Sequence, residues 1–236
     1  MISVTELSKN YASVWKKTFP FISKLVRKCN LQKESFEEHL VSDIAPSRRA
    51  LVNEIAFRLF EKAIDLNLKN VEDIESQVLE EVSEKTRKYI AGLEKTQSLE
   101  VATKHEIAEC FKIAKRTKQY FNDYDNTSKL VVSPFFSGCG IVSSCYGDVL
   151  SNDTLYEIKA GDRDFRVSDL KQLLVYSTLN FANHEENIKF IALVNPRLGI
   201  FVKLSIKESV ELASGKSAAD AFNELINFFD NPDDFR

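Results

Sequence analysis

The chain has 236 residues, of which 44% are hydrophobic and 28% are charged, and its formal net charge at pH 7 is −3. This composition is typical of a soluble globular protein, and it excludes both an intrinsically disordered chain and a globally basic nucleic-acid-binding protein. The longest purely apolar run, Phe190 to Val194, is too short to cross a membrane. We therefore expect a cytoplasmic protein with no signal peptide and no membrane partner.

The four cysteines give no sign of a metal-binding or redox motif. They are widely scattered, and the sequence contains neither a CxxC pair nor a cysteine–histidine spacing of the zinc-binding kind. In a reducing compartment we expect them to be small apolar side chains of the interior. They are Cys29, Cys110, Cys139 and Cys145.

Residues 1–95 are expected to form an all-helical N-terminal region. The clearest pattern covers 48–66, where apolar side chains recur on one face of a helix and Pro46 and Ser47 stand where helices begin. A second helix is expected over 71–90. Because the broad apolar face of 48–66 needs a covering surface, we expect this region to pack on the rest of the chain, on a second copy in a homodimer or on a partner subunit, and to contact substrate.

The pattern changes after Gly92, and residues 96–236 predict an α/β domain. A helix is expected between two groups of strands, which requires a crossover connection and therefore a mixed central sheet flanked by helices. The helices are expected over 99–121, over 167–182 with Ser168 as its N-cap, and over 218–229. The strands are expected over 129–136, 146–150, 154–160, 188–194 and 199–206.

The stretch "GDVLSNDTLYEIKAG", residues 147–161, carries the candidate chemistry. Side chains alternate faces along a strand, so Glu157 and Lys159 share one face of the strand over 154–160. The polar turn before that strand allows a hairpin that brings Asp148 next to Glu157. Two carboxylates held close together repel each other unless a cation neutralises them, and an all-oxygen ligand set suits Mg²⁺ or Mn²⁺.

The same acids could instead be the solvated face of an ordinary hairpin. A short acid-x-Lys triplet is weak evidence for a site on its own. A second triplet, residues 169–171, falls on an expected helix, where we expect its charged side chains to lie on the exposed surface. Three features favour a site for the first triplet. It lies on a strand, Asp148 precedes Glu157 by nine residues across a turn, and Gly147 frees the backbone before Asp148.

The order of these residues resembles the PD-(D/E)XK nuclease superfamily, in particular its RecB-like branch. The shared pieces are an Asp, a Glu-x-Lys on the next strand, and a helix with Gln-x-x-x-Tyr. In this chain they are Asp148, Glu157, Lys159, Gln172 and Tyr176. The resemblance spans about residues 96–206 and includes the helix, three strands, helix, strand order. It implies a restriction-endonuclease-like core in residues 96–236.

The resemblance also implies roles for single residues. Asp148 and Glu157 would coordinate Mg²⁺, which Mn²⁺ can replace, with the backbone carbonyl of Ile158 as a further ligand. Lys159 would serve the attacking water or the transition state, and the Gln-x-x-x-Tyr pair, Gln172 and Tyr176, would orient the site or the nucleic-acid backbone. The family often adds an acid from the helix before the first strand. For that acid we name Glu106, with Glu100 nearly as good.

The surroundings of the motif suggest how nucleic acid would be held. Arg163, Arg166 and Lys171 follow Lys159 closely and are candidates for phosphate contacts.

Some RecB-like nucleases bind an iron–sulfur cluster through cysteines that follow the Gln-Tyr helix. Because this chain has no cysteine after Cys145, we expect no such cluster.

The sequence thus predicts a Mg²⁺-dependent nuclease that hydrolyses phosphodiester bonds of DNA. By analogy with compact members of the family, it would be an endonuclease in a restriction or phage-defence setting. Cleavage of RNA is the alternative within enzymes, because the same site would serve. A non-catalytic module that binds nucleic acid or scaffolds a complex on the same fold is the alternative from another class.

Overall fold

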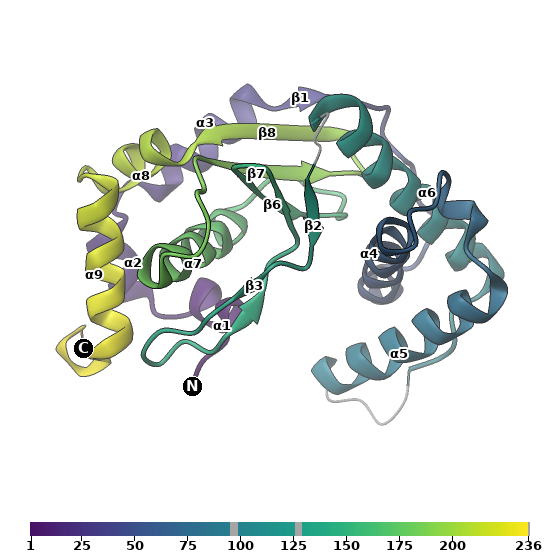
Figure 1. Cartoon of the computed structure of the whole chain (residues 1–236), viewed down its shortest axis with the longest axis horizontal. Helices are drawn as coiled ribbons and strands as arrows, with labels where there is room; N and C mark the ends of the chain where they lie inside the picture. Colours follow the sequence, from purple (N-terminus) through teal and green to yellow (C-terminus); the bar gives the residue numbers. More distant parts are fainter. Residues whose placement is uncertain (95–98, 126–128, 236) are drawn as a thin grey trace.

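The computed structural model describes residues 1–94, 99–125 and 129–235 as a mixed α/β fold (Figure 1). The helices are α1 (Val4–Lys9), α2 (Ala12–Thr18), α3 (Ile22–Gln32), α4 (Arg49–Asp65), α5 (Ser76–Glu94), α6 (Lys104–Tyr120), α7 (Val167–Asn183), α8 (Ile206–Ser214) and α9 (Ala218–Asp230). The strands are β1 (Glu34–Ser35), β2 (Leu130–Val132), β3 (Phe135–Phe136), β4 (Cys145–Tyr146), β5 (Val149–Ser151), β6 (Thr154–Ile158), β7 (Phe190–Asn195) and β8 (Ile200–Ser205).

The expectation of a mixed sheet flanked by helices is confirmed. Six strands lie in the order β1-β8-β7-β6-β5-β2. β6 and β7 are parallel, and α7 is the crossover between them, whereas the other neighbours are antiparallel. β3 and β4 form a separate two-stranded ribbon.

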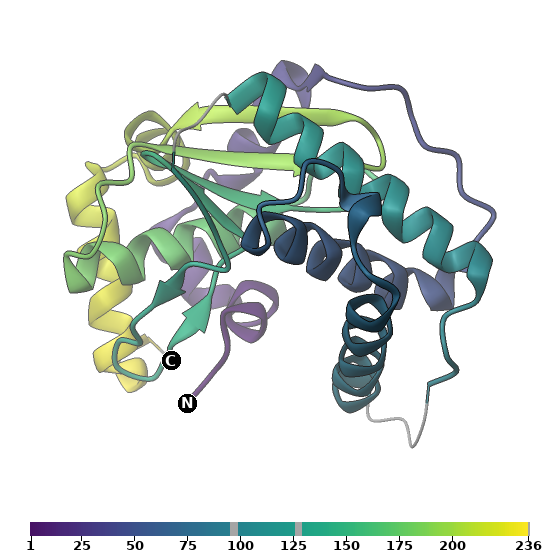
Figure 2. The same cartoon turned by 45° about the vertical axis from the view of Figure 1, so that its right-hand side comes forward.

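Two hydrophobic clusters cover the two faces of the sheet, as the strand alternation requires. Along β7, Ile191 and Leu193 belong to a cluster shared with α1, α2, α3, α7, α8 and α9. Ala192 and Val194 belong to the other cluster, shared with α4, α5 and α6. Figure 2 shows this second group of helices on the side of the sheet opposite to α7 and α9.

The helix expected over 48–66 is α4, preceded by a 3₁₀ turn over Pro46–Arg48. Its apolar stripe is buried against α6, α5 and the sheet. The chain therefore covers this face itself, within one protomer. Fully burying a large apolar side chain is worth about 1.5–3 kcal/mol, so the stripe anchors α4 firmly.

The expectation of an all-helical N-terminal region is wrong, because this region also contributes a strand to the sheet. After α3 the chain extends as β1 and pairs with β8, with Glu34 opposite Phe201. β8 would otherwise expose its backbone donors and acceptors at the sheet edge, and β1 covers those at its first two residues, Ile200 and Phe201. β1 is too short for a sequence pattern to reveal.

Other elements also differ from the expectation. The strand expected over 129–136 is divided into β2 and β3, because Ser133 adopts a positive φ of 52° before Pro134. α8 was not expected; Ser205 caps its start and Gly215, with φ of 74°, ends it. α7 begins at Val167 as expected, but its N-cap is Arg166 rather than Ser168, and the carboxylate of Asp169 accepts the backbone N–H of Arg166.

The first 94 residues share both clusters with the rest of the chain. α1, α2 and α3 pack with α7, α8 and α9, whereas α4 and α5 pack on the opposite face. The domain boundary expected between residues 95 and 96 lies outside the described residues. Across the described ranges, none of the helices combines the length and the apolarity that crossing a bilayer requires.

Candidate active site

The β5–β6 hairpin places Asp148 and Glu157 on facing positions. The register pairs Val149 with Tyr156, so the next position outward sets Asp148 against Glu157. Oδ2 of Asp148 accepts the backbone N–H of Ile158 at 2.6 Å, which anchors this carboxylate at the end of β6. The side-chain alternation expected for β6 holds, because Tyr156 and Ile158 pack in the cluster on the opposite face.

Both carboxylates are disfavoured as anions in the metal-free protein. Burial raises the pKa of Asp148, and the charge of Lys159 opposes this only in part. Burial, followed by the charge of Asp148, raises the pKa of Glu157 to about 8. A positive charge in this cavity, in addition to that of Lys159, would stabilise the ionised form of both carboxylates.

One oxygen of Glu157 is left without a partner. Glu157 is 2% exposed, and its Oε1 accepts a hydrogen bond from Nζ of Lys159. Its Oε2 is buried and makes no hydrogen bond within the described structure. A buried carboxylate oxygen normally has a donor or a cation beside it. This orphaned oxygen belongs to the residue opposite Asp148 in the hairpin, and it fits a hard cation such as Mg²⁺.

Lys159 is held as an ammonium between β6 and α7. Its Nζ donates to Glu157 and, at 2.8 Å, to Oε1 of Gln172. Burial alone would lower the pKa of Lys159, but Glu157 and Asp148 outweigh it and the pKa is raised. The ammonium is therefore fixed in position and charged.

Tyr176 lies one helical turn beyond Gln172 on α7. It is buried, and its ring stacks on Phe136 with 5.6 Å between the ring centroids. Burial, followed by the nearby charges of Glu157 and Asp148, raises the pKa of Tyr176, so its hydroxyl stays neutral. The structure thus brings five predicted residues together, namely Asp148, Glu157, Lys159, Gln172 and Tyr176.

Four of these five residues, all except Lys159, line a cavity of about 520 Å³ at the end of the β5–β6 hairpin. Ile158 lines it, and one wall comes from the N-terminal region. α4 supplies Asn53, Glu54 and Arg58, and α5 supplies Tyr89. The first 94 residues therefore shape the candidate site directly.

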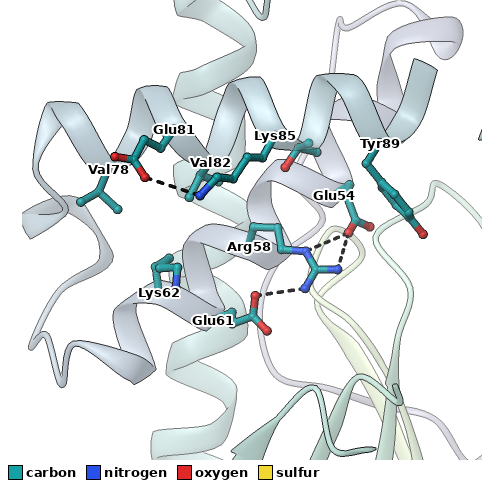
Figure 3. A pocket seen from close by; sticks show the side chains of 10 residues that line it. Glu54, Arg58, Glu61, Lys62, Val78, Glu81, Val82, Lys85 and Tyr89 are labelled. Carbon is teal, nitrogen blue, oxygen red and sulfur yellow. Dashed lines mark hydrogen bonds and ion pairs between the residues drawn. The ribbon is translucent and has the colours of Figure 1, made fainter. Parts of the chain in front are cut away.

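Glu54 is a functional candidate that the sequence analysis missed. It lines the cavity, and its charge contributes to the raised pKa of Asp148 while Arg58 opposes it. Its Oε1 accepts a hydrogen bond from Nε of Arg58 at 3.0 Å, and Arg58 also donates to Glu61 (Figure 3). The one available signal was its place beside the apolar stripe of α4.

The structure does not bring Glu106 or Glu100 to this cavity. The Glu106 carboxylate caps its own helix by accepting the backbone N–H of Thr103, and it pairs with Nε of Arg48 at 2.7 Å. The hydrogen bond from Arg48 lowers the pKa of Glu106 to about 2. Glu100 is exposed, and its backbone carbonyl accepts from Arg48. Glu54 is therefore the better candidate for the helix acid.

The three predicted phosphate contacts differ in availability. Arg163 makes two hydrogen bonds to Asp169, at 2.7 and 3.0 Å. Lys171 lies over the ring of Trp15, with Nζ 4.8 Å from the centroid, and burial lowers the pKa of Lys171. Arg166 is exposed. Within this group Arg166 is the residue best placed to meet a ligand from solvent.

In the part of the chain that the structure describes, no group of three or more His, Cys, Asp or Glu side chains gathers as a ready metal site. Asp148 and Glu157 are a pair, and Glu54 lines the same cavity. No protein-family model matches the sequence, and no curated protein matches it either. The chemistry of this cavity is therefore what indicates a function.

Proposed function

We propose that the protein is a metal-dependent nuclease that hydrolyses phosphodiester bonds of DNA. The observation that supports this most strongly is the buried, unpartnered Oε2 of Glu157, which lies opposite Asp148 and beside the ammonium of Lys159. Two facing carboxylates and a fixed cation in a cavity suit a phosphate ester held by a divalent ion.

In this proposal Asp148 and Glu157 hold Mg²⁺ or Mn²⁺, and Ile158 lies where its backbone can add a ligand. Bound there, the ion would lower the pKa of a water molecule and neutralise charge on the phosphate. Binding would also displace the proton that the raised pKa of Glu157 retains near neutral pH, so affinity should rise with pH.

The remaining residues position the reaction. Lys159 donates to the attacking water or to the phosphate oxygen on which charge develops. Gln172 fixes the Lys159 ammonium through its 2.8 Å hydrogen bond. Tyr176 keeps its proton and can donate to a phosphate oxygen. The PD-(D/E)XK resemblance assigns the same roles, and from it comes the proposal of an endonuclease in restriction or phage defence.

A substrate panel tests the proposal. Purified protein with Mg²⁺ or Mn²⁺ is incubated with plasmid, linear duplex DNA, single-stranded DNA and RNA. We expect cleavage of DNA by the wild type and by Glu211→Gln, which changes an exposed acid on α8. No cleavage of any substrate with either ion, by folded protein, would overturn the proposal. Cleavage of RNA but not of DNA would show that the protein is a ribonuclease instead.

A further inference from the structure

A second cavity, between α4 and α5, adjoins the candidate active-site cavity. This second cavity has a volume of about 360 Å³. Glu54, Arg58 and Tyr89 line both cavities, so the two lie side by side. In Figure 3, Tyr89 extends from α5 on the side where Glu54 and Arg58 lie.

Two tyrosine rings face this space from separate elements. Tyr89 on α5 is 53% exposed and Tyr146 on β4 is 65% exposed, and both line the active-site cavity. Tyr146 also meets exposed Phe135 of the adjacent strand edge-on, with 5.4 Å between centroids. Aromatic rings left uncovered beside a polar cavity are the groups on which nucleic-acid bases stack.

The cations that line the two cavities are engaged by carboxylates. Among the residues that line either cavity, the cations are Arg58, Lys62 and Lys85. Each of them pairs with a carboxylate. Arg58 pairs with Glu54 and Glu61, Lys62 pairs with Asp65, and Lys85 pairs with Glu81. Binding of duplex DNA depends on phosphate contacts from several available Lys or Arg side chains, whereas an unpaired strand can also stack its bases on aromatic rings.

The depth of the carboxylates points the same way. Glu157 is almost fully buried, so a phosphodiester must enter the cavity to reach it. A volume of about 520 Å³ is that of a small-molecule pocket, which admits a nucleotide but not a double helix. Enzymes with such sites act on single strands or on nucleotides taken out of the helix.

We propose that this cavity takes an unpaired DNA strand, with bases stacked on Tyr89 and Tyr146 and the phosphodiester at Asp148 and Glu157. The strand would continue past Arg58 into the α4–α5 cavity. This inference rests on the proposed nuclease function and adds the substrate class to it.

Fluorescence anisotropy with a short labelled oligonucleotide tests the inference in EDTA, where no cleavage is expected. The single strand should bind at least about tenfold more tightly than the same strand annealed to its complement. Tyr89→Ala and Tyr146→Ala should each weaken single-strand binding about tenfold, because each removes a stacking surface. Tyr89→Phe and Tyr146→Phe should retain it, because the ring remains.

Tyr124→Ala is the matched control. Tyr124 is 52% exposed, close to the value for Tyr89, but it lies outside both cavities. Its substitution should leave binding unchanged. Duplex bound as tightly as single strand, or unchanged binding by folded Tyr89→Ala and Tyr146→Ala, would overturn the inference.

Cleavage assays separate this inference from the proposed function. Single-strand binding that depends on both rings, without cleavage of any nucleic acid, would support the inference as a binding site and overturn the nuclease proposal. Metal-dependent cleavage of duplex and single strand at equal rates would support the nuclease and overturn the inference.

Discussion

Glu157 makes the stability of the metal-free protein depend on pH. Its pKa is raised from 4.5 to about 8, so the folded state holds this proton more tightly than the unfolded state. The contribution of Glu157 to the free energy of unfolding is most favourable below the unfolded pKa of 4.5 and is lost as pH rises through about 8. Asp148, whose pKa is also raised, acts in the same direction.

We therefore predict that Glu157→Gln stabilises the protein in EDTA at high pH. The variant keeps the shape of a neutral carboxyl but cannot become a buried anion. Its melting temperature should exceed that of the wild type near pH 9, by about 2–4 °C for each kcal/mol, and the difference should shrink as pH falls and vanish below about pH 4. Thermal unfolding across this range measures it. A difference that does not change with pH would show that Glu157 is not the group responsible.

A second prediction separates Glu54 from Glu106. Glu54 lines the cavity, so Glu54→Gln should lower the cleavage rate with little change in stability. Glu106 caps α6 and pairs with Arg48, so Glu106→Gln should cost about 1 kcal/mol of stability and leave the rate intact. Initial rates and urea unfolding of both variants decide it. The reverse result would return the helix-acid role to Glu106.

These residues show what a sequence can predict about a site. Asp148 and Glu157 could be paired in advance because a strand alternates with period two and a short turn fixes the register. Glu54 could not be found in this way. Its position depends on how α4 packs against the end of the sheet, which no local pattern encodes.

At the scale of elements, Arg197 joins three of them around the site. It is fully buried in the turn between β7 and β8. Nη1 pairs with Glu109 of α6 at 2.6 Å, Nη2 donates to Asn53 of α4 at 3.0 Å, and Nε donates to the backbone carbonyl of Ala160 at 2.7 Å. Ala160 and Asn53 both line the active-site cavity, so Arg197 fixes α4 beside β6.

Arg197→Met should destabilise the protein by about 3–5 kcal/mol, because it leaves the carboxylate of Glu109 buried without its cation. Urea unfolding measures this loss. A second variant with both Arg197→Met and Glu109→Met serves as the control and should recover part of it, because it removes the unpaired charge as well. A change within experimental error for the single variant would mean that the pair does not secure α4.

The elements themselves were predictable to different extents. α4 could be predicted, because its long apolar stripe and the proline before it both indicate a helix in the same place. β1 and α8 were not. β1 has no pattern of its own and exists because the edge of β8 needs a partner, and α8 follows β8 without a break. The division of β2 from β3 depends on a positive φ at Ser133, where the sequence carries no glycine.

At the scale of the whole molecule, the N-terminal residues are part of the core. They contribute to both hydrophobic clusters, to the sheet edge through β1 and to the cavity wall through α4. We predict that a chain beginning at Leu99 retains the candidate catalytic residues but loses solubility, substrate affinity and specificity. Solubility, circular dichroism and oligonucleotide binding test this. A shortened chain that is soluble, monomeric, active and equally selective would contradict it.

Cleavage of labelled single-stranded DNA as a function of divalent metal, by the wild type and by Asp148→Ala, Glu157→Ala and Lys159→Ala, tests the central claim most directly. We predict that the wild type requires Mg²⁺ or Mn²⁺, loses activity in EDTA and is suppressed by excess Ca²⁺, which accepts looser geometry. Each variant, while folded, should lose about a hundred- to a thousandfold in rate, and Glu211→Gln should lose nothing. Wild-type cleavage by folded Glu157→Ala, or undiminished cleavage after exhaustive chelation, would contradict the account.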